Sequence, residues 1–155
     1  MSTRAMIAMK VSNKNRKKNV IKAVFSRCDG YPYDEMLKWG TGIELVTKHN
    51  TTKLVEKLIS KGYIKDIAIG CEYKVMRYSY DYYNKKIDGV RTCINKITID
   101  DFIKGNLDDK LWSGGLFGIE YGYYWTGSIW VVADYHKHII MPLKDYLKTN
   151  YGVRI

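Results

Sequence analysis

The sequence predicts an α+β fold in which a mostly antiparallel sheet carries two or three helices on one face. Short segments rich in Val, Ile, Tyr and Trp recur between turn residues, as is typical of strands. Two other segments repeat their apolar residues at the spacing of one helix face. The 155 residues are 46% hydrophobic, which predicts a single domain over residues 1–155 with a sizeable core.

The first predicted element is a basic N-terminal hairpin over residues 3–28. Residues 3–11 alternate loosely and residues 20–25 form the antiparallel return strand. The connecting loop, residues 12–19, is rich in asparagine and basic residues and is expected at the tip of the hairpin. A sharp turn follows at Asp29-Gly30-Tyr31-Pro32, because Gly tolerates positive φ and Pro fixes φ.

Three helices are predicted next, over residues 33–39, 43–49 and 52–61. Thr51 or Thr52 is a suitable N-cap for the third of them. The apolar face of that helix is expected to bury Leu54, Val55, Leu58 and Ile59.

The middle of the chain is predicted to form strands over residues 64–69 and 72–83, with residues 90–98 pairing back onto the second of them. Thr98 is expected to cap a short helix that ends at Gly105. The side chains expected to point inward from this helix are those of Phe102 and Ile103.

The last third of the chain predicts a hairpin and a final helix. Residues 119–125 and 129–133 are the two strands of the hairpin, and residues 136–140 extend the sheet. Pro142 suits the first turn of the helix, which ends near Gly152. Its inward side chains are expected to be Leu143, Tyr146 and Leu147.

Positive charge is concentrated at one end of the chain. Residues 1–28 carry +8 of the net charge of +10, because they hold eight basic residues and no acidic one. These are Arg4, Lys10, Lys14, Arg16, Lys17, Lys18, Lys22 and Arg27. Such a cluster can neutralise nucleic-acid phosphates or dock on an acidic protein surface, and it can equally be a solvated loop.

Three other patterns are more typical of structural residues than of binding or catalytic residues. Tyr78, Tyr80 and Tyr82 share one side of a predicted strand and could stack bases, but such a stripe more often covers a half-buried sheet face. His136 and His138 point the same way on a strand, yet two ligands do not make a metal site. The glycine-rich residues 113–118 lack the Gly-Lys-Ser/Thr ending of a phosphate loop. No cofactor, metal or catalytic set is predicted.

Several segments together resemble a group of small phage and prophage proteins. The opening Met1-Ser2-Thr3-Arg4, the strand that leads into Asp29-Gly30-Tyr31-Pro32, the helix after it and the "LISKGYIKDI" segment match that group in order. A late Glu120-Tyr121-Gly122-Tyr123 hairpin with an aromatic return strand is a further match. Members often have a histidine and an aromatic before the Asp, where this chain has Arg27 and Cys28. The resemblance implies that the protein is encoded by a phage or prophage and shares the fold of this group. It does not imply any catalysed reaction.

The expected function is that of a phage-encoded, non-enzymatic inhibitor, for example an anti-CRISPR protein, acting in the host cytoplasm. Its partner would be a host defence protein or ribonucleoprotein with an acidic surface. The alternatives are a stand-alone nucleic-acid-binding module and an enzyme that cleaves nucleotides or nucleic acids and uses Asp29 with nearby histidines. The residues expected to contact a partner or phosphate are Lys14, Arg16, Lys17, Lys18, Lys22, Arg27, Asp29 and Tyr31.

No contact with a membrane is expected. The longest apolar run, residues 139–141, is far too short to cross a bilayer, and the N-terminus lacks the apolar region of a signal peptide. The three cysteines, Cys28, Cys71 and Cys93, are widely spaced and are expected to be reduced thiols.

Overall fold

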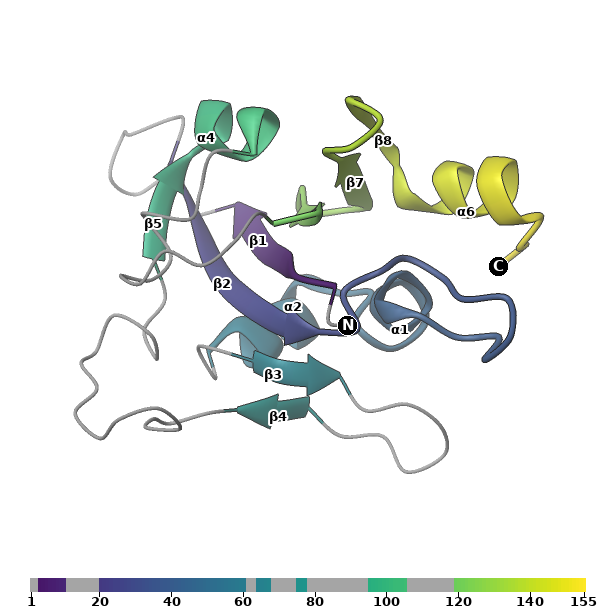
Figure 1. Ribbon diagram of the computed structural model, residues 1–155. Coiled ribbons are helices and arrows are strands. Elements are labelled where there is room, and N and C mark those ends of the chain that lie inside the picture. Colours follow the sequence, from purple (N-terminus) through teal and green to yellow (C-terminus); the bar gives the residue numbers. More distant parts are fainter. Residues whose placement is uncertain (1–2, 11–19, 61–63, 68–74, 78–94, 106–118) are drawn as a thin grey trace.

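The computed structural model describes residues 3–10, 20–60, 64–67, 75–77, 95–105 and 119–155. Its helices pack on a mostly antiparallel sheet (Figure 1). The strand order is β4-β3-β2-β1-β6-β7-β8, and β5 pairs with β2 beside this path. Only β1 with β6 and β2 with β3 are parallel among the described pairings. The predicted α+β class is confirmed. The strands are β1 (Ala5–Lys10), β2 (Val20–Cys28), β3 (Ile64–Ile67), β4 (Val75–Arg77), β5 (Asn95–Thr98), β6 (Tyr121–Trp125), β7 (Trp130–Asp134) and β8 (Ile139–Pro142).

Strand β1 lies at the centre of the sheet. It pairs with β2 in the predicted antiparallel hairpin, with Ala5 opposite Ser26 and Lys10 opposite Ile21. On its other side it pairs with β6, which lies more than a hundred residues later in the chain. Every residue of β1 except Lys10 is buried, because helices cover both faces of the sheet at this strand.

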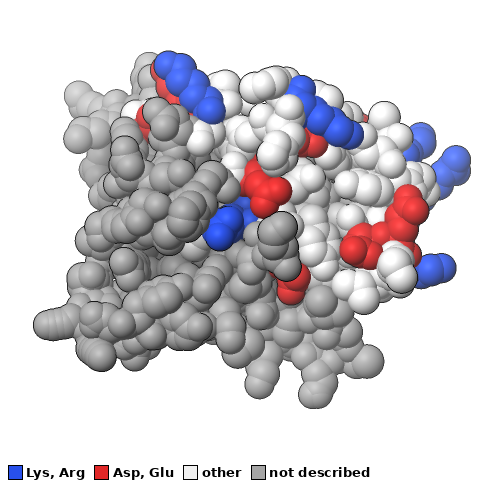
Figure 2. Space-filling view, in the orientation of Figure 1, with Lys and Arg blue, Asp and Glu red and all other residues white. Residues whose placement is uncertain are grey.

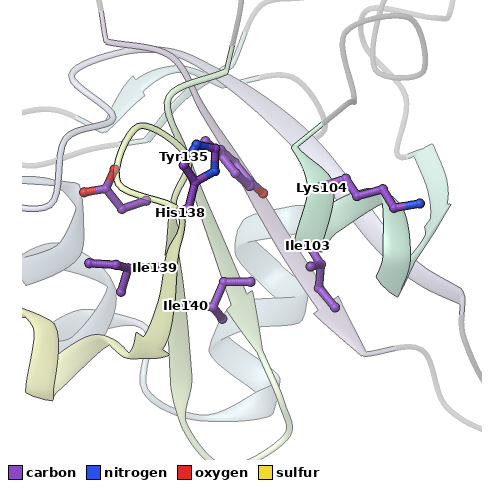
Figure 3. A pocket seen from close by; sticks show the side chains of 7 residues that line it. Ile103, Lys104, Tyr135, His138, Ile139 and Ile140 are labelled. Carbon is purple, nitrogen blue, oxygen red and sulfur yellow. The ribbon is translucent and has the colours of Figure 1, made fainter.

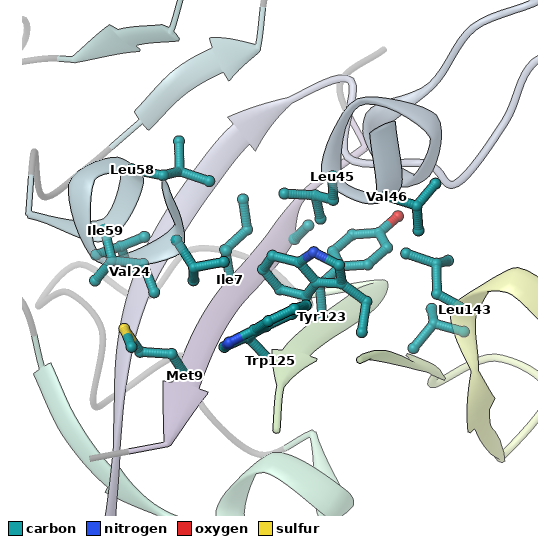
Figure 4. Close-up of a cluster of buried hydrophobic side chains, with 14 of the residues drawn as sticks. Ile7, Met9, Val24, Leu45, Val46, Leu58, Ile59, Tyr123, Trp125 and Leu143 are labelled. Atoms are coloured by element: carbon teal, nitrogen blue, oxygen red, sulfur yellow. The ribbon is translucent and has the colours of Figure 1, made fainter. Parts of the chain in front are cut away.

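The larger core lies on the face covered by three helices, α1 (Thr41–Lys48), α2 (Thr52–Ile59) and α6 (Leu143–Tyr151). Their apolar side chains pack on alternate residues of β1 and on the aromatic residues of β6 and β7 (Figure 4). The short helix α4 (Ile99–Lys104) covers the opposite face, where Phe102 packs with Met6 and Phe25. The prediction of two or three helices on one face is therefore confirmed, with α4 on the other.

Helix α2 begins at its predicted cap, since the Thr51 side chain accepts a hydrogen bond of 3.2 Å from the Leu54 amide. Val55, Leu58 and Ile59 are buried as predicted, but Leu54 is 39% exposed. Successive residues turn by about 100° around a helix, which places Leu54 at the margin of the buried face. The expected burial of Leu54 is wrong.

The helix predicted over residues 33–39 is also wrong. Asp34 and Trp39 instead form an isolated antiparallel bridge that closes a tight loop. The Asp34 carboxylate accepts hydrogen bonds from the amides of Met36, at 2.8 Å, and Leu37, at 3.1 Å. A local bond of this kind gives the backbone an alternative to a helix. The following helix, α1, starts at Thr41, two residues before its predicted start.

Two details of the later strands and of α4 differ from expectation. Strand β5 pairs with β2, not with the strand expected over residues 72–83, of which the structure describes only β4. Thr98 caps α4 in a capping box and Gly105 ends it, as predicted. Phe102 is buried, but Ile103 is 49% exposed because this six-residue helix packs along one side only.

The C-terminal hairpin and helix follow the prediction closely. Strands β6 and β7 pair from Tyr121 opposite Asp134 to Trp125 opposite Trp130. Strand β8 extends the sheet on β7, although residues 136–138 form a turn instead of its beginning. Helix α6 buries Leu143, Tyr146 and Leu147 and ends at Gly152, whose φ of 69° is left-handed. Tyr78, Tyr80, Tyr82, Cys71, Cys93 and residues 113–118 lie outside the described residues.

The helices in the described segments lack the length and apolar character needed to cross a bilayer.

Candidate interaction site

The turn at Asp29-Gly30-Tyr31-Pro32 joins three parts of the core. The Gly30 amide donates to the Thr3 carbonyl at 2.9 Å, and its own carbonyl accepts the Tyr123 hydroxyl at 2.5 Å. Asp29 takes a φ of 56°, and the Thr41 hydroxyl donates to its carbonyl at 2.6 Å. The turn is thereby held to β1, β6 and the start of α1, and it fixes where the next loop leaves the core.

Tyr31 continues from this turn into the base of the loop. Its ring lies edge-on to Trp39 with 6.3 Å between centroids, and its carbonyl accepts the Thr41 amide at 3.0 Å. Burial raises the pKa of Tyr31 to about 12, with smaller contributions from the charges of Asp29 and Asp34. Tyr31 is half-buried and serves mainly to support the loop.

Trp39 anchors the far end of the same loop. Its Nε1 donates a 2.6 Å hydrogen bond to Oε1 of Glu44, a carboxylate that is only 3% exposed. Lys48 Nζ lies 3.8 Å from the same oxygen, one helical turn along α1. A charge-assisted bond in the interior is strong, so this end of the loop is tied firmly to α1.

The loop between these anchors presents an apolar knob, defined here as Met36 and Leu37. Met36 is 91% exposed and Leu37 is 51% exposed. The backbone below them is ordered by the 2.7 Å bond from the Asp34 amide to the Trp39 carbonyl and by the Asp34 side chain. Lys38 adopts a left-handed φ of 54° and so completes the reversal of direction.

Acidic residues flank the knob on its N-terminal side. Asp34 and Glu35 precede it in the chain, and both charges contribute to a raised pKa of Tyr151 at the end of α6, where burial is the main cause. The rings of Tyr33 and Tyr151 lie 5.4 Å apart and hold this part of the loop against α6. Figure 2 shows acidic side chains close together on the side of the molecule where the loop lies.

The sequence-based prediction missed this knob because it placed a helix over residues 33–39. The signal that could have revealed it is the Asp two residues before Met36, together with Gly40 after the loop. An aspartate at this spacing favours a turn in which its side chain bonds the following amides.

Most of the predicted contact residues cannot be placed beside this knob. Lys14, Arg16, Lys17 and Lys18 lie outside the described residues. Lys22 lies in β2, opposite Met9 of β1 and Lys96 of β5, and is half-buried. Arg27 is a residue of β2. Of the predicted residues, Asp29 and Tyr31 are the two that the structure brings together at the base of the loop.

A buried polar network centred on Asp134 lies beneath α6. Its Oδ2 accepts the Tyr146 hydroxyl at 2.6 Å, and its Oδ1 accepts the amides of His136, at 3.0 Å, and Lys137, at 3.1 Å. Burial raises the pKa of nearby Tyr121 to about 12, and the charge of Asp134 adds to the effect. The carboxylate links β7, the following turn and α6, which is a structural role.

The three histidines lie at the end of α1 and in the turn between β7 and β8. His136 Nε2 lies 3.3 Å from Glu120 Oε1 in an exposed pair, and His138 takes a left-handed φ of 55° in the turn. Asp29 contacts the first residue of α1 whereas His49 follows its last, so roughly 12 Å of helix separates them. Within the described segments, no group of three or more His, Cys, Asp or Glu side chains could hold a metal ion.

His49 should make stability depend on pH. Burial lowers its pKa from 6.5 to about 4, and the charge of Lys48 adds to this. Between these values the unfolded chain binds a proton that the folded chain does not, so lowering the pH destabilises the fold, by about 1–3 kcal/mol after allowance for partial exposure. Above pH 6.5 the effect is absent.

Urea unfolding at neutral pH and at pH values down to about 4 measures this slope in the wild type and in His49→Gln. The variant keeps the backbone carbonyl that accepts Trp130 Nε1 at 2.8 Å, so it tests the imidazole alone. A flatter pH dependence in the variant is expected. Parallel curves would show that His49 titrates normally in the folded protein.

Comparison with known proteins adds no further assignment. No protein-family model matches the chain, and no curated protein and no solved structure matches it significantly, so a proposed function depends on the geometry described above.

Proposed function

We propose that this is a non-enzymatic binding protein that docks on a protein partner through the apolar knob. The observation that carries the proposal is the exposure of two large apolar side chains, 91% for Met36 and 51% for Leu37, on a loop anchored at both ends. Exposed apolar residues scattered singly are ordinary, but an adjacent pair on an ordered loop favours an interaction site. An ordered loop also binds with little loss of conformational entropy.

The chemistry of the knob specifies the kind of partner. Full burial of each of its side chains would contribute about 1.5–3 kcal/mol. A flexible methionine adapts to pockets of irregular shape. Asp34 and Glu35 beside the knob favour a partner whose apolar pocket has a basic rim, because opposite charges guide association and set its orientation.

The likeness to small phage proteins supports an inhibitor that blocks a host defence or nucleic-acid-handling machine, of which an anti-CRISPR protein is one example. The net charge of +10 suits a ribonucleoprotein target, since it accelerates the encounter with anionic surfaces. In this proposal the basic N-terminal segment attracts the target from a distance and the knob makes the short-range contact.

The knob can be tested by capture of partners from a bacterial host lysate, with and without nuclease. The double variant Met36→Ser/Leu37→Ser should retain at least tenfold less of the nuclease-resistant partner than the wild type, which corresponds to about 1.4 kcal/mol. Its melting temperature should change by no more than a few degrees, because neither side chain is buried. Ile129→Ser is the matched control, since Ile129 is 48% exposed on a different turn and should not affect capture.

A fourfold Ser variant of Lys14, Arg16, Lys17 and Lys18 separates the two classes of partner. If nuclease abolishes capture, and the fourfold variant loses it while the knob variant does not, the protein is a nucleic-acid-binding module. Equal capture by the wild type and the knob variant after nuclease treatment would refute docking through the knob.

A further inference from the structure

A hollow of about 400 Å³ lies between α4 and the end of the β7–β8 hairpin (Figure 3). Its walls come from two segments that are thirty residues apart in the chain, since one ends at Lys104 and the other begins at Asp134. The residues that line it are Ile103, Lys104, Asp134, Tyr135, His138, Ile139 and Ile140.

The hollow offers an apolar surface that is already formed. Ile103 is 49% exposed and Ile140 is 44% exposed, so two of the large apolar side chains left open to solvent lie here on facing elements. Tyr135 between them is held in place by a 2.5 Å hydrogen bond from its hydroxyl to the Phe102 carbonyl. A side chain entering the hollow would therefore meet isoleucines without any need to reorder the wall.

The polar groups of the hollow favour the binding of an acidic group. Lys104 contributes a cation from α4, and His138 contributes an imidazole from the turn before β8. The acid in the lining, Asp134, is only 2% exposed and uses its oxygens for Tyr146 and for two backbone amides. The accessible polar groups are thus a cation and an imidazole, which suit carboxylates beside an apolar residue.

We propose that this hollow receives the apolar knob of a second copy of the chain, so that the protein self-associates. The knob presents Met36 and Leu37 next to Asp34 and Glu35, which complement the isoleucines and the basic groups of the hollow. The inference rests on the proposed function, because it uses the same knob and names a further partner for it.

The knob and the hollow lie over different cores of the molecule. The base of the knob loop, at Tyr31 and Tyr33, packs on the core that lies beneath α1, α2 and α6. The hollow opens beside α4 and is lined by Tyr135, which packs with Phe102 in the second core. Figure 1 shows α4 well apart from the loop that precedes α1. The proposed contact therefore joins two copies of the chain. The contact is directional, joining unlike surfaces of the two copies.

The consequence for function is competition. A knob seated in the hollow of a neighbouring copy is not free to bind a target, so self-association and target binding exclude each other at that knob. A variant that loses the hollow should therefore capture a target at least as well as the wild type does.

Sedimentation of the purified protein over a range of concentrations tests the proposal. The wild type should exceed the monomer mass as its concentration rises. Two variants should each weaken this association by at least tenfold. They are the lysine knob variant Met36→Lys/Leu37→Lys, which places cations against Lys104, and the hollow variant Ile140→Glu, which places an acid against Asp34 and Glu35. Ile129→Glu is the matched control and should associate like the wild type.

Mixing provides the decisive measurement. The lysine knob variant keeps an intact hollow and the hollow variant keeps an intact knob. Their mixture should therefore form a heterodimer at concentrations where each variant alone stays largely monomeric. A wild type that stays monomeric, an association that survives in the hollow variant, or a mixture without heterodimer would each overturn the inference. None of these results bears on the proposed function, which is measured separately by capture of a target with the same hollow variant.

Discussion

Replacing Asp134 with alanine is expected to lower the free energy of unfolding by about 3–5 kcal/mol. The carboxylate is only 2% exposed and accepts three hydrogen bonds, from the Tyr146 hydroxyl and from the amides of His136 and Lys137. Removing it leaves those three donors without their acceptor in a site that water reaches poorly. Chemical denaturation at neutral pH measures the loss directly.

Tyr146→Phe is the matched variant for this network. It removes the hydroxyl that donates to Asp134 at 2.6 Å but keeps the buried ring and both amide bonds. The expected loss is about 1–3 kcal/mol, clearly smaller than that for Asp134→Ala. Equal losses in the two variants would show that the backbone bonds of Asp134 contribute little to stability.

Leu58→Ala is expected to reduce the free energy of unfolding by about 2–5 kcal/mol. Leu58 is 1% exposed in the main core, where α2 packs on β1. The truncated side chain would leave a cavity that rigid strands and neighbouring helices fill only in part. A loss below about half a kcal/mol in chemical denaturation would mean that this face of α2 is not core.

Leu54→Ala makes the same chemical change on the same helix and serves as the control. Leu54 is 39% exposed, so its truncation removes less buried surface and creates no enclosed cavity. We expect a loss below about 1 kcal/mol. Losses of similar size at both positions would contradict the orientation of α2 on the sheet.

The two candidate contact regions of the chain differ in physical character. The basic N-terminal segment acts through charge, so its contribution to binding should fall as salt increases. The knob acts mainly through apolar burial, which salt does not screen. Binding that survives nuclease and high salt but requires Met36 and Leu37 would therefore separate docking on a protein from attraction to phosphates.

Local features were the most predictable from the sequence. The hairpin from residue 3 to residue 28, the Thr51 and Thr98 caps, and the left-handed ends at Gly105 and Gly152 all follow from side chains close in the chain. Each depends on short-range sterics or on a side chain that bonds an amide three residues away. These local preferences do not depend on contacts with distant parts of the chain.

Residues 33–39, which were predicted to form a short helix, form a tight loop instead. The Asp34 side chain accepts hydrogen bonds from the amides of Met36 and Leu37. The Trp39 indole donates a hydrogen bond to the buried Glu44 of α1. The hydrogen bonds of Asp34 are local, so they could have been inferred from the sequence. The hydrogen bond of Trp39 depends on where α1 lies against the sheet, and no pattern within the loop encodes it.

Patterns among neighbouring residues were enough to predict the α+β class, the order of most elements and the buried side chains Val55, Leu58 and Ile59 of α2. Hydrophobic periodicity and capping depend on residues that are close in the chain. Three features could be known only from the folded protein: β6 pairs with β1 in parallel, α4 covers the opposite face of the sheet, and Ile103 and Ile140 border one hollow. Contacts between distant segments depend on the packing of the whole core. The Asp34 turn was foreseeable from the sequence, but the exposure of Met36 and Leu37 depends on the packing of the residues around them.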